Sequence, residues 1–321
     1  MTKTNPILKV SKLHFSYGDK AILKNVSFRL KEGETLGIIG ESGSGKTSLL
    51  KLLGGLLKAD SGELLFEGNP IPGPDERLIA GHEHIKLVHQ DFDLMPYLSV
   101  KENVLRHSLS ESQSGREKIL KHFQKQLKLM EVSGNRATDT SGGQKQRIAM
   151  ATAVSASPDV LLLDEPFSNL DYPLKMDLIH LLKTEWKPRA MIIVTHEPSD
   201  ILQMADRILV MSKGRVVQRG TAHEVYQYPK NESIGKLLGA INKLSAEQAK
   251  LFGISSEKEV YLRPHQLVIG DSGVEGEVKS CRFMGATYLV EVLVEGVSCL
   301  TMFYHRSRLP TGTNVTICYK N

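Results

Sequence analysis

Apolar and polar positions follow two different periods along this chain. Fully apolar runs at 36–39, 160–163 and 191–194 are bounded by turn residues and separated by helix-like segments. Such runs are typical of strands buried on both faces of a parallel sheet. The alternating segments 7–15 and 25–30 predict two further strands near the start, and 207–211 with 215–218 predict a hairpin around Lys213 and Gly214. The first part of the chain is therefore predicted to be α/β with a mixed sheet.

Between the predicted strands, the pattern indicates a helical insertion. Ser99 with Glu102 three residues later forms a capping-box pattern, which predicts a helix start. A second amphipathic helix is expected to run to about residue 130. Its apolar face is expected to hold Ile119, Leu120, Phe123, Leu127 and Met130.

The pattern changes near Glu259, where period-two segments take over up to Tyr319 with glycines between them. This predicts a small all-β unit, barrel-like or sandwich-like. We expect a linker at 245–258. The predicted domains are 1–240 and 241–321, the second consisting of the linker and the β unit.

The segment 40–47, Gly-Glu-Ser-Gly-Ser-Gly-Lys-Thr, lies between a predicted strand and a predicted helix. It matches the pattern G-x-x-x-x-G-K-[ST] in the context that this pattern requires, so we favour it over a chance turn. Backbone N–H groups in such a loop bind phosphate oxygens, the lysine reaches the β/γ-phosphates and the threonine hydroxyl binds Mg²⁺. A dinucleotide fingerprint is excluded because no third glycine or alanine follows. The predicted nucleotide-binding residues are Gly40, Ser42, Gly43, Ser44, Gly45, Lys46, Thr47 and Ser48.

Polar side chains follow three predicted strands at the edge where ligands bind in open α/β sheets. Asp164 and Glu165 end the run 160–163, His196 follows 191–194, and Gln90 follows the strand 85–89. Asp164 is a candidate Mg²⁺ partner, and Glu165 is a candidate for polarising an attacking water. His196 has an alternative role as a structural histidine. A helix that starts at 141–144, Ser-Gly-Gly-Gln, offers backbone donors like those of the first loop.

Composition places the chain among soluble globular proteins. Hydrophobic residues make up 40% and charged residues 24% of 321 positions, with no apolar run near the ~18 residues that span a bilayer. The net charge of +5 is modest, and no dense basic block points to nucleic acid. Cys281, Cys299 and Cys318 have no metal or disulfide spacing. We therefore expect a cytosolic protein that reaches the membrane only through a partner.

Together these motifs resemble the ATP-binding cassette (ABC) ATPases. The loop 40–47 resembles the Walker A motif, 160–165 Walker B, 168–171 the D-loop and 141–144 the family signature. The resemblance implies ATP and Mg²⁺ as cofactors. It also implies Gln90, Glu165 and His196 as catalytic residues, with Thr47, Gln90 and Asp164 near the metal. The nucleotide contacts that it adds are Tyr17, Ser141, Gly142, Gly143, Gln144 and Asp171.

The tail 261–285, with Tyr-Leu-Arg-Pro-His and Phe-Met-Gly, is similar to the OB-like TOBE domain of ATPases that serve binding-protein-dependent importers. The implied partners are a second ATPase subunit, a permease and a solute-binding protein, with no nucleic acid. Thr140 departs from the family's usual leucine, and Tyr172 and Pro173 follow the D-loop where a small residue and an arginine are common.

The short tail favours iron(III), a polyamine or an oxyanion as cargo over a sugar. An alternative is a soluble ABC ATPase that acts on nucleic acid or ribosomes. The β tail is also open to a ligand-sensing role, which is compatible with transport.

Overall fold

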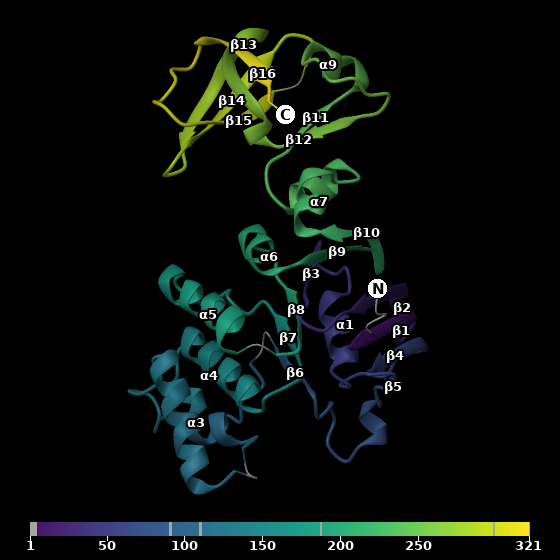
Figure 1. Ribbon diagram of the computed structural model, residues 1–321, viewed down its shortest axis with the longest axis vertical. Helices are drawn as coiled ribbons and strands as arrows, with labels where there is room; N and C mark the ends of the chain where they lie inside the picture. The colour runs from purple at the N-terminus through teal and green to yellow at the C-terminus, as the bar shows by residue number, and fades with distance from the viewer. Residues whose placement is uncertain (1–4, 90–91, 109–110, 187, 298, 321) are drawn as a thin grey trace. The chain divides into compact units, whose positions relative to one another are not determined.

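The computed structural model describes residues 5–89, 92–108, 111–186, 188–297 and 299–320 (Figure 1). The chain forms two compact units, Met1–Ala222 and His223–Asn321. The expected domain limits, 1–240 and 241–321, stay a prediction.

The first unit contains two sheets among its described residues. An antiparallel sheet has the order β2-β1-β4-β5, and a mixed sheet has the order β10-β9-β3-β8-β7-β6. The antiparallel strands are β1 (Leu8–Tyr17), β2 (Lys20–Leu30), β4 (Ser61–Phe66) and β5 (Asn69–Pro70). The mixed sheet consists of β3 (Thr35–Gly40), β6 (Ile85–Val88), β7 (Val160–Asp164), β8 (Ala190–Val194), β9 (Arg207–Ser212) and β10 (Arg215–Thr221). Only the predicted β9–β10 hairpin is antiparallel in this second sheet, so the mixed α/β fold is confirmed.

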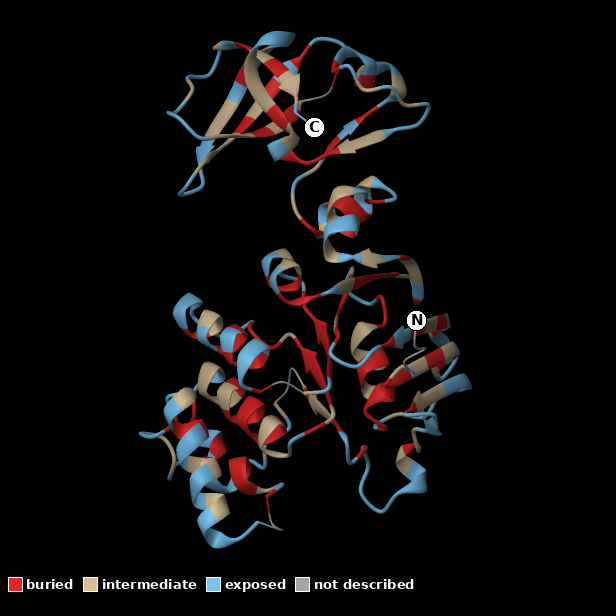
Figure 2. Ribbon diagram, in the orientation of Figure 1, coloured by how far each residue is buried: buried red, intermediate tan, exposed pale blue. Residues whose placement is uncertain are grey.

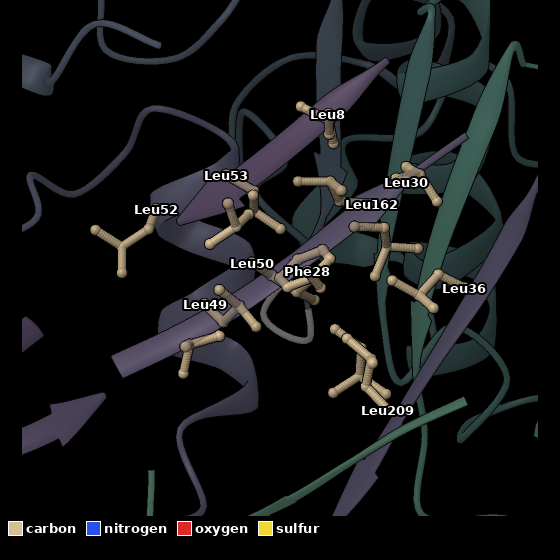
Figure 3. Close-up of a cluster of buried hydrophobic side chains, with 14 of the residues drawn as sticks. Leu8, Phe28, Leu30, Leu36, Leu49, Leu50, Leu52, Leu53, Leu162 and Leu209 are labelled. Carbon is tan, nitrogen blue, oxygen red and sulfur yellow. The ribbon is translucent and has the colours of Figure 1, made fainter. Parts of the chain in front are cut away.

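Helix α1 (Lys46–Leu53) lies between the two sheets and holds them together (Figures 1 and 3). Its four leucines are fully buried, against β1 and β2 on one side and β3, β7 and β9 on the other. Figure 2 shows the inner strands of the mixed sheet as buried, in agreement with their continuous apolar sequences. The phosphate-loop helix is therefore anchored at the centre of the hydrophobic core.

The predicted helical insertion is present as α2 (Val100–Leu105), α3 (Gln113–Gln126) and α4 (Gly142–Ser155). The Ser99–Glu102 capping box forms as expected. Phe123 and Leu127 are buried, but Met130 is 64% exposed, so its placement on the apolar face was wrong. The reason is that α3 ends at Gln126 and the chain turns away before Met130. Helices α5 (Tyr172–Thr184) and α6 (Pro198–Met204) complete this unit.

The second unit is built around an antiparallel sheet of order β15-β14-β13-β16. Its elements are α7 (Ala222–Gln227), α8 (Glu232–Leu237), β11 (Asn242–Leu244), α9 (Ala246–Leu251), β12 (Val260–Leu262), β13 (Leu267–Phe283), β14 (Tyr288–Val294), β15 (Leu300–Tyr304) and β16 (Asn314–Tyr319). The linker expected at 245–258 was wrong, because α9 lies there and Ala249 and Phe252 join the core of this unit. The β architecture is consistent with an OB-like fold.

Across the described residues, no helix is both long enough and apolar enough to cross a membrane. The three cysteines are free thiols of intermediate exposure.

Candidate functional site: a nucleotide-binding cavity

The loop 40–47 joins β3 to α1, as the sequence predicts. Gly45 is the residue before the helix and has φ of 100°, a left-handed conformation that glycine adopts without strain. The Lys46 ammonium donates hydrogen bonds to the carbonyls of Gly40 (2.8 Å) and Glu41 (3.0 Å), so it links the end of the loop to its start. Burial lowers the pKa of Lys46, and the carboxylates of Glu165 and Asp164 oppose that shift. The lysine is thus held in the loop as a partly desolvated cation beside two acids.

A cavity of about 510 Å³ lies over this loop. The predicted residues that line it come from the ends of three neighbouring parallel strands, β3, β7 and β8. They are Gly40, Ser42, Gly43, Gly45, Lys46, Thr47, Ser48, Asp164, Glu165 and His196. Predicted site residues as far apart in sequence as Gly40 and His196 therefore meet at one edge of the sheet.

Asp164 offers a carboxylate oxygen that has no partner in the part of the chain that the structure describes. The residue is 2% exposed, and its Oδ2 is buried without a hydrogen bond among the described residues. Burial raises the pKa of Asp164, while a hydrogen bond with Thr47 lowers it. A buried, unsatisfied carboxylate oxygen beside a threonine hydroxyl is a donor set that suits Mg²⁺. These two residues therefore fit the metal that the sequence predicts.

Glu165 and His196 form a pair at the same cavity. Glu165 Oε2 lies 2.8 Å from His196 Nδ1. The hydrogen bond with Glu165, and then its charge, raise the pKa of His196. Glu165 has φ of 51°, an uncommon conformation for a residue with a side chain and one that is typical of functional sites. Its N–H donates to the carbonyl of Val194 (2.9 Å), which ties the end of β7 to β8.

The signature residues lie at the start of α4 but do not line this cavity. Ser141 and Gln144 form a reciprocal capping box: Gln144 N–H donates to Ser141 Oγ (3.3 Å), and Ser141 N–H donates to Gln144 Oε1 (2.8 Å). Gly142 and Gly143 begin the helix itself. Within one chain, then, the predicted nucleotide contacts form two separate sets.

The remaining predicted residues lie as follows. Asp171 caps α5 by accepting a hydrogen bond from Leu174 N–H (3.2 Å), and it does not line the cavity. Tyr17 is half exposed, packs edge-on against Phe15, and is likewise not among the lining residues. Ser44 is buried in the loop, with Oγ unpartnered among the described atoms. Gln90 lies outside the described residues.

Four residues at or near the cavity were not predicted as site residues, and one of them is Val194, the last residue of β8, which lines the cavity. Lys20 and Ile22 line it from β2, and their place close after Tyr17, a predicted nucleotide contact, was the available signal. Gln146 is buried and donates from Nε2 to the carbonyl of Glu165 at 2.9 Å. The residues 145–147, Lys-Gln-Arg, follow the signature as the resemblance to the family leads one to expect, but that resemblance gave Gln146 no role.

Comparison with known proteins agrees with this geometry. A family model described as "ABC transporter" matches residues 23–168. The chain is 37% identical over 249 residues to the spermidine/putrescine import ATP-binding protein PotA of Pasteurella multocida, covering 76% of this chain and 66% of that protein, just under two thirds. It is 33% identical over 291 residues to the sulfate/thiosulfate import ATP-binding protein CysA of Pseudomonas syringae, covering 85% and 84%.

The fold has similar solved structures. One is the dimeric ATP-binding cassette MJ0796 in a post-hydrolysis state with ADP and Pi, at 29% identity and a TM-score of 0.61. The match covers 67% of this chain and 98% of that one. From the motifs, the cavity and these likenesses we conclude that the chain belongs to the ABC transporter family, as an ATPase similar to those of importers.

Proposed function

We propose that this chain is the ATP-hydrolysing subunit that energises a binding-protein-dependent importer of a small solute. The observation that carries the proposal is the cavity at the sheet edge, where the phosphate loop, Asp164, Glu165 and His196 meet. The two import ATP-binding proteins among its relatives support the direction of transport.

In this proposal the loop 40–47 holds the phosphates of ATP, and Lys46 turns from the loop carbonyls to the β/γ-phosphates. Thr47 and Asp164 would hold Mg²⁺, together with Gln90; the metal supplies charge neutralisation on the β- and γ-phosphates. Glu165 accepts a proton from the attacking water or orients it. His196 lies 2.8 Å from Glu165 and contacts the γ-phosphate. Tyr17 stacks on the base.

Two copies are proposed to face each other head to tail. Because Ser141, Gly142, Gly143 and Gln144 do not line the cavity of their own chain, they are free to complete the partner's site. Asp171 and the D-loop lie next to that helix start, since Asn169 N–H donates to Gln146 of α4 (3.1 Å). ATP would then be enclosed only when two chains close, which links hydrolysis to a conformational change.

A second cavity of the first unit, about 550 Å³, is the proposed docking site for a permease segment. Apolar side chains of Leu56, Ile79 and Met95 line it, and Ile79 is 80% exposed. Three cations, Arg77, Lys86 and Arg106, line the same cavity and outnumber its two acids, Glu83 and Asp93. An exposed apolar groove with cationic groups suits an amphipathic helix that carries an acidic residue. Through such a segment the chain would lie at the cytoplasmic face of the membrane.

The proposed cargo is a polyamine, iron(III) or an oxyanion, in preference to a sugar. Polyamine and sulfate/thiosulfate import are the functions named for the two relatives, so both chemistries stay within the proposal. The second unit, with its antiparallel β13–β16 sheet, is proposed to be the TOBE-like domain of such ATPases.

The test is purification of the full chain from membranes, with a surface substitution that separates docking from folding. The unaltered chain should bring down a permease and a solute-binding protein, and ligand screening on the latter would name the cargo. Ile79→Asp should abolish recovery of the permease while ATP binding persists. Leu293→Asp, a matched apolar-to-acidic change at a 54% exposed position of β14, should not affect recovery. Recovery of ribosomes or DNA alone would replace the proposal with a soluble ATPase.

A further inference from the structure

Gln146 joins three parts of the site through one buried amide. It lies one turn into α4, is 2% exposed, and uses both ends of its side chain. Nε2 donates to the carbonyl of Glu165 (2.9 Å), and Oε1 accepts from the N–H of Asn169 in the D-loop (3.1 Å). One side chain therefore fixes the backbone of the catalytic glutamate and the backbone of the D-loop against the signature helix.

The backbone conformation of Glu165 depends on hydrogen bonds such as the one from Gln146. Its left-handed backbone (φ 51°) is uncommon for a side-chain-bearing residue and needs surrounding contacts to persist. Three of those contacts act on its carbonyl: Gln146 Nε2 (2.9 Å), Ser168 Oγ (3.1 Å) and the Ser168 N–H (3.4 Å). If these contacts were lost, φ of Glu165 could relax, and rotation about its N–Cα bond moves the carbonyl and the side chain together, which would carry the carboxylate away from His196.

We propose that Gln146 is a positioning residue for hydrolysis: it holds Glu165 in the productive orientation and makes that orientation follow α4. The part of this inference that concerns a second nucleotide site rests on the proposed function. In the head-to-tail dimer, α4 begins against the partner's nucleotide. The same amide then links the state of one nucleotide site to the glutamate that works at the other.

Packing near the Gln146 amide also fixes the position of α4 relative to the D-loop. The backbone of α4 approaches the D-loop so closely that a Cβ on Gly143 would lie 2.7 Å from the carbonyl oxygen of Asn169. Gln146 and Gly143 therefore contact the same D-loop residue through its two backbone polar groups, one by a hydrogen bond and one by close approach. Both constraints must move together if α4 moves.

The experiment replaces the amide by an apolar side chain of similar length, Gln146→Met, in the full chain. We expect kcat to fall roughly 10- to 100-fold, the range for a misplaced catalytic group, with ATP affinity within about two-fold of the unaltered chain. The matched control is Gln124→Met, which removes another buried glutamine amide, hydrogen-bonded to Ser133 in the helical insertion. Its kcat should stay within about two-fold, since it contacts no part of the cavity.

A double-substitution cycle shows whether the effect passes through Glu165. In a Glu165→Gln background, measured by single turnover, Gln146→Met should lower the rate by less than about two-fold, because the group it positions no longer acts as a base. An equal fall in both backgrounds, or an unchanged kcat in the single variant, would overturn the proposal.

If Gln146→Met does not fold, Gln146→Glu at alkaline pH serves instead. Its ionised carboxylate still accepts from Asn169 N–H but has no hydrogen for the carbonyl of Glu165, so kcat should again fall. These rates are measured on the ATPase alone. If the Gln146 variants keep a normal kcat, the result of the membrane purification does not change. If no permease is recovered in that purification, the kinetic test of Gln146 still stands.

Discussion

The two adjacent signature glycines differ in a way that predicts opposite effects of the same substitution. A Cβ on Gly143 would lie 2.7 Å from the carbonyl oxygen of Asn169, whereas a Cβ on Gly142 would meet nothing closer than 4.0 Å. Both residues are in the first turn of α4, and neither has a positive φ. Alanine is therefore conformationally acceptable at both positions, and only the close approach at 143 separates them.

The magnitude follows from the contact distance. To reach an ordinary contact of about 3.4 Å, the D-loop carbonyl must move by about 0.7 Å (3.4 minus 2.7). Overpacking of this kind costs about 1–3 kcal/mol. Replacement of a helical glycine by alanine returns about 0.5–1 kcal/mol at either position. Since that gain is common to both, Gly143→Ala should be less stable than Gly142→Ala by about 1–3 kcal/mol.

The assay is thermal unfolding of the full chain without nucleotide, so that contacts with a partner's ATP do not contribute. Trp186 is the single tryptophan of the chain, lies in the first unit and is 7% exposed, so its fluorescence reports on that unit alone. For a unit of this size, 1 kcal/mol corresponds to roughly 2–4 °C in Tm. Gly143→Ala should melt below the unaltered chain or near it, and Gly142→Ala slightly above it. Equal melting temperatures for the two variants would refute the reasoning.

Three further outcomes are expected. Glu165→Gln should reduce hydrolysis by roughly 10²–10⁴-fold with ATP binding retained, and near-normal turnover would remove Glu165 from its role as base. Because Glu165 raises the pKa of His196 above 6.5, NMR titration should show a lower pKa for His196 in Glu165→Gln. In the unaltered chain this pair stabilises the fold below pH ~6.5 and loses its effect as pH rises through the raised value. Arg263→Met should destabilise the second unit by more than about 3 kcal/mol, judged by circular dichroism in urea, because it removes the guanidinium donor from the carbonyls of Tyr226, Gly239 and Ala240. Arg282→Met, which removes a pair with Glu291 from an arginine 61% exposed, should cost less than about 1 kcal/mol.

Local pattern was enough to predict the catalytic edge of the sheet. The runs 160–163 and 191–194 are continuous apolar stretches, so strands β7 and β8 and the polar residues that end them could be placed in advance. Parallel pairing then brings Asp164 level with Val194, one residue before Thr195 and two before His196. The phosphate loop was equally local, because its glycines, lysine and threonine are consecutive.

Prediction failed where a residue's burial or role depends on contacts with groups distant in sequence, or on where a helix ends. Segment 245–258 has the polar composition of a linker, yet Ala249 and Phe252 are buried by contacts with the β sheet of the second unit. The spacing of Met130 matched the apolar face of the predicted helix, but the helix ends four residues earlier, at Gln126.

Gln146 is the clearest case of such dependence. Its neighbours in sequence give no reason for a buried amide, because its partners are backbone groups 19 and 23 residues away. A backbone carbonyl has no sequence signature, and the left-handed turn at Glu165 that exposes it is visible only in the folded chain. Sequence motifs therefore identify the groups that touch the nucleotide, whereas the groups that orient them through main-chain contacts emerge only from the structure. Since Gln146 holds a carbonyl rather than the reacting carboxylate, its loss should reduce turnover without weakening nucleotide binding, and that separation distinguishes positioning from catalysis in this site.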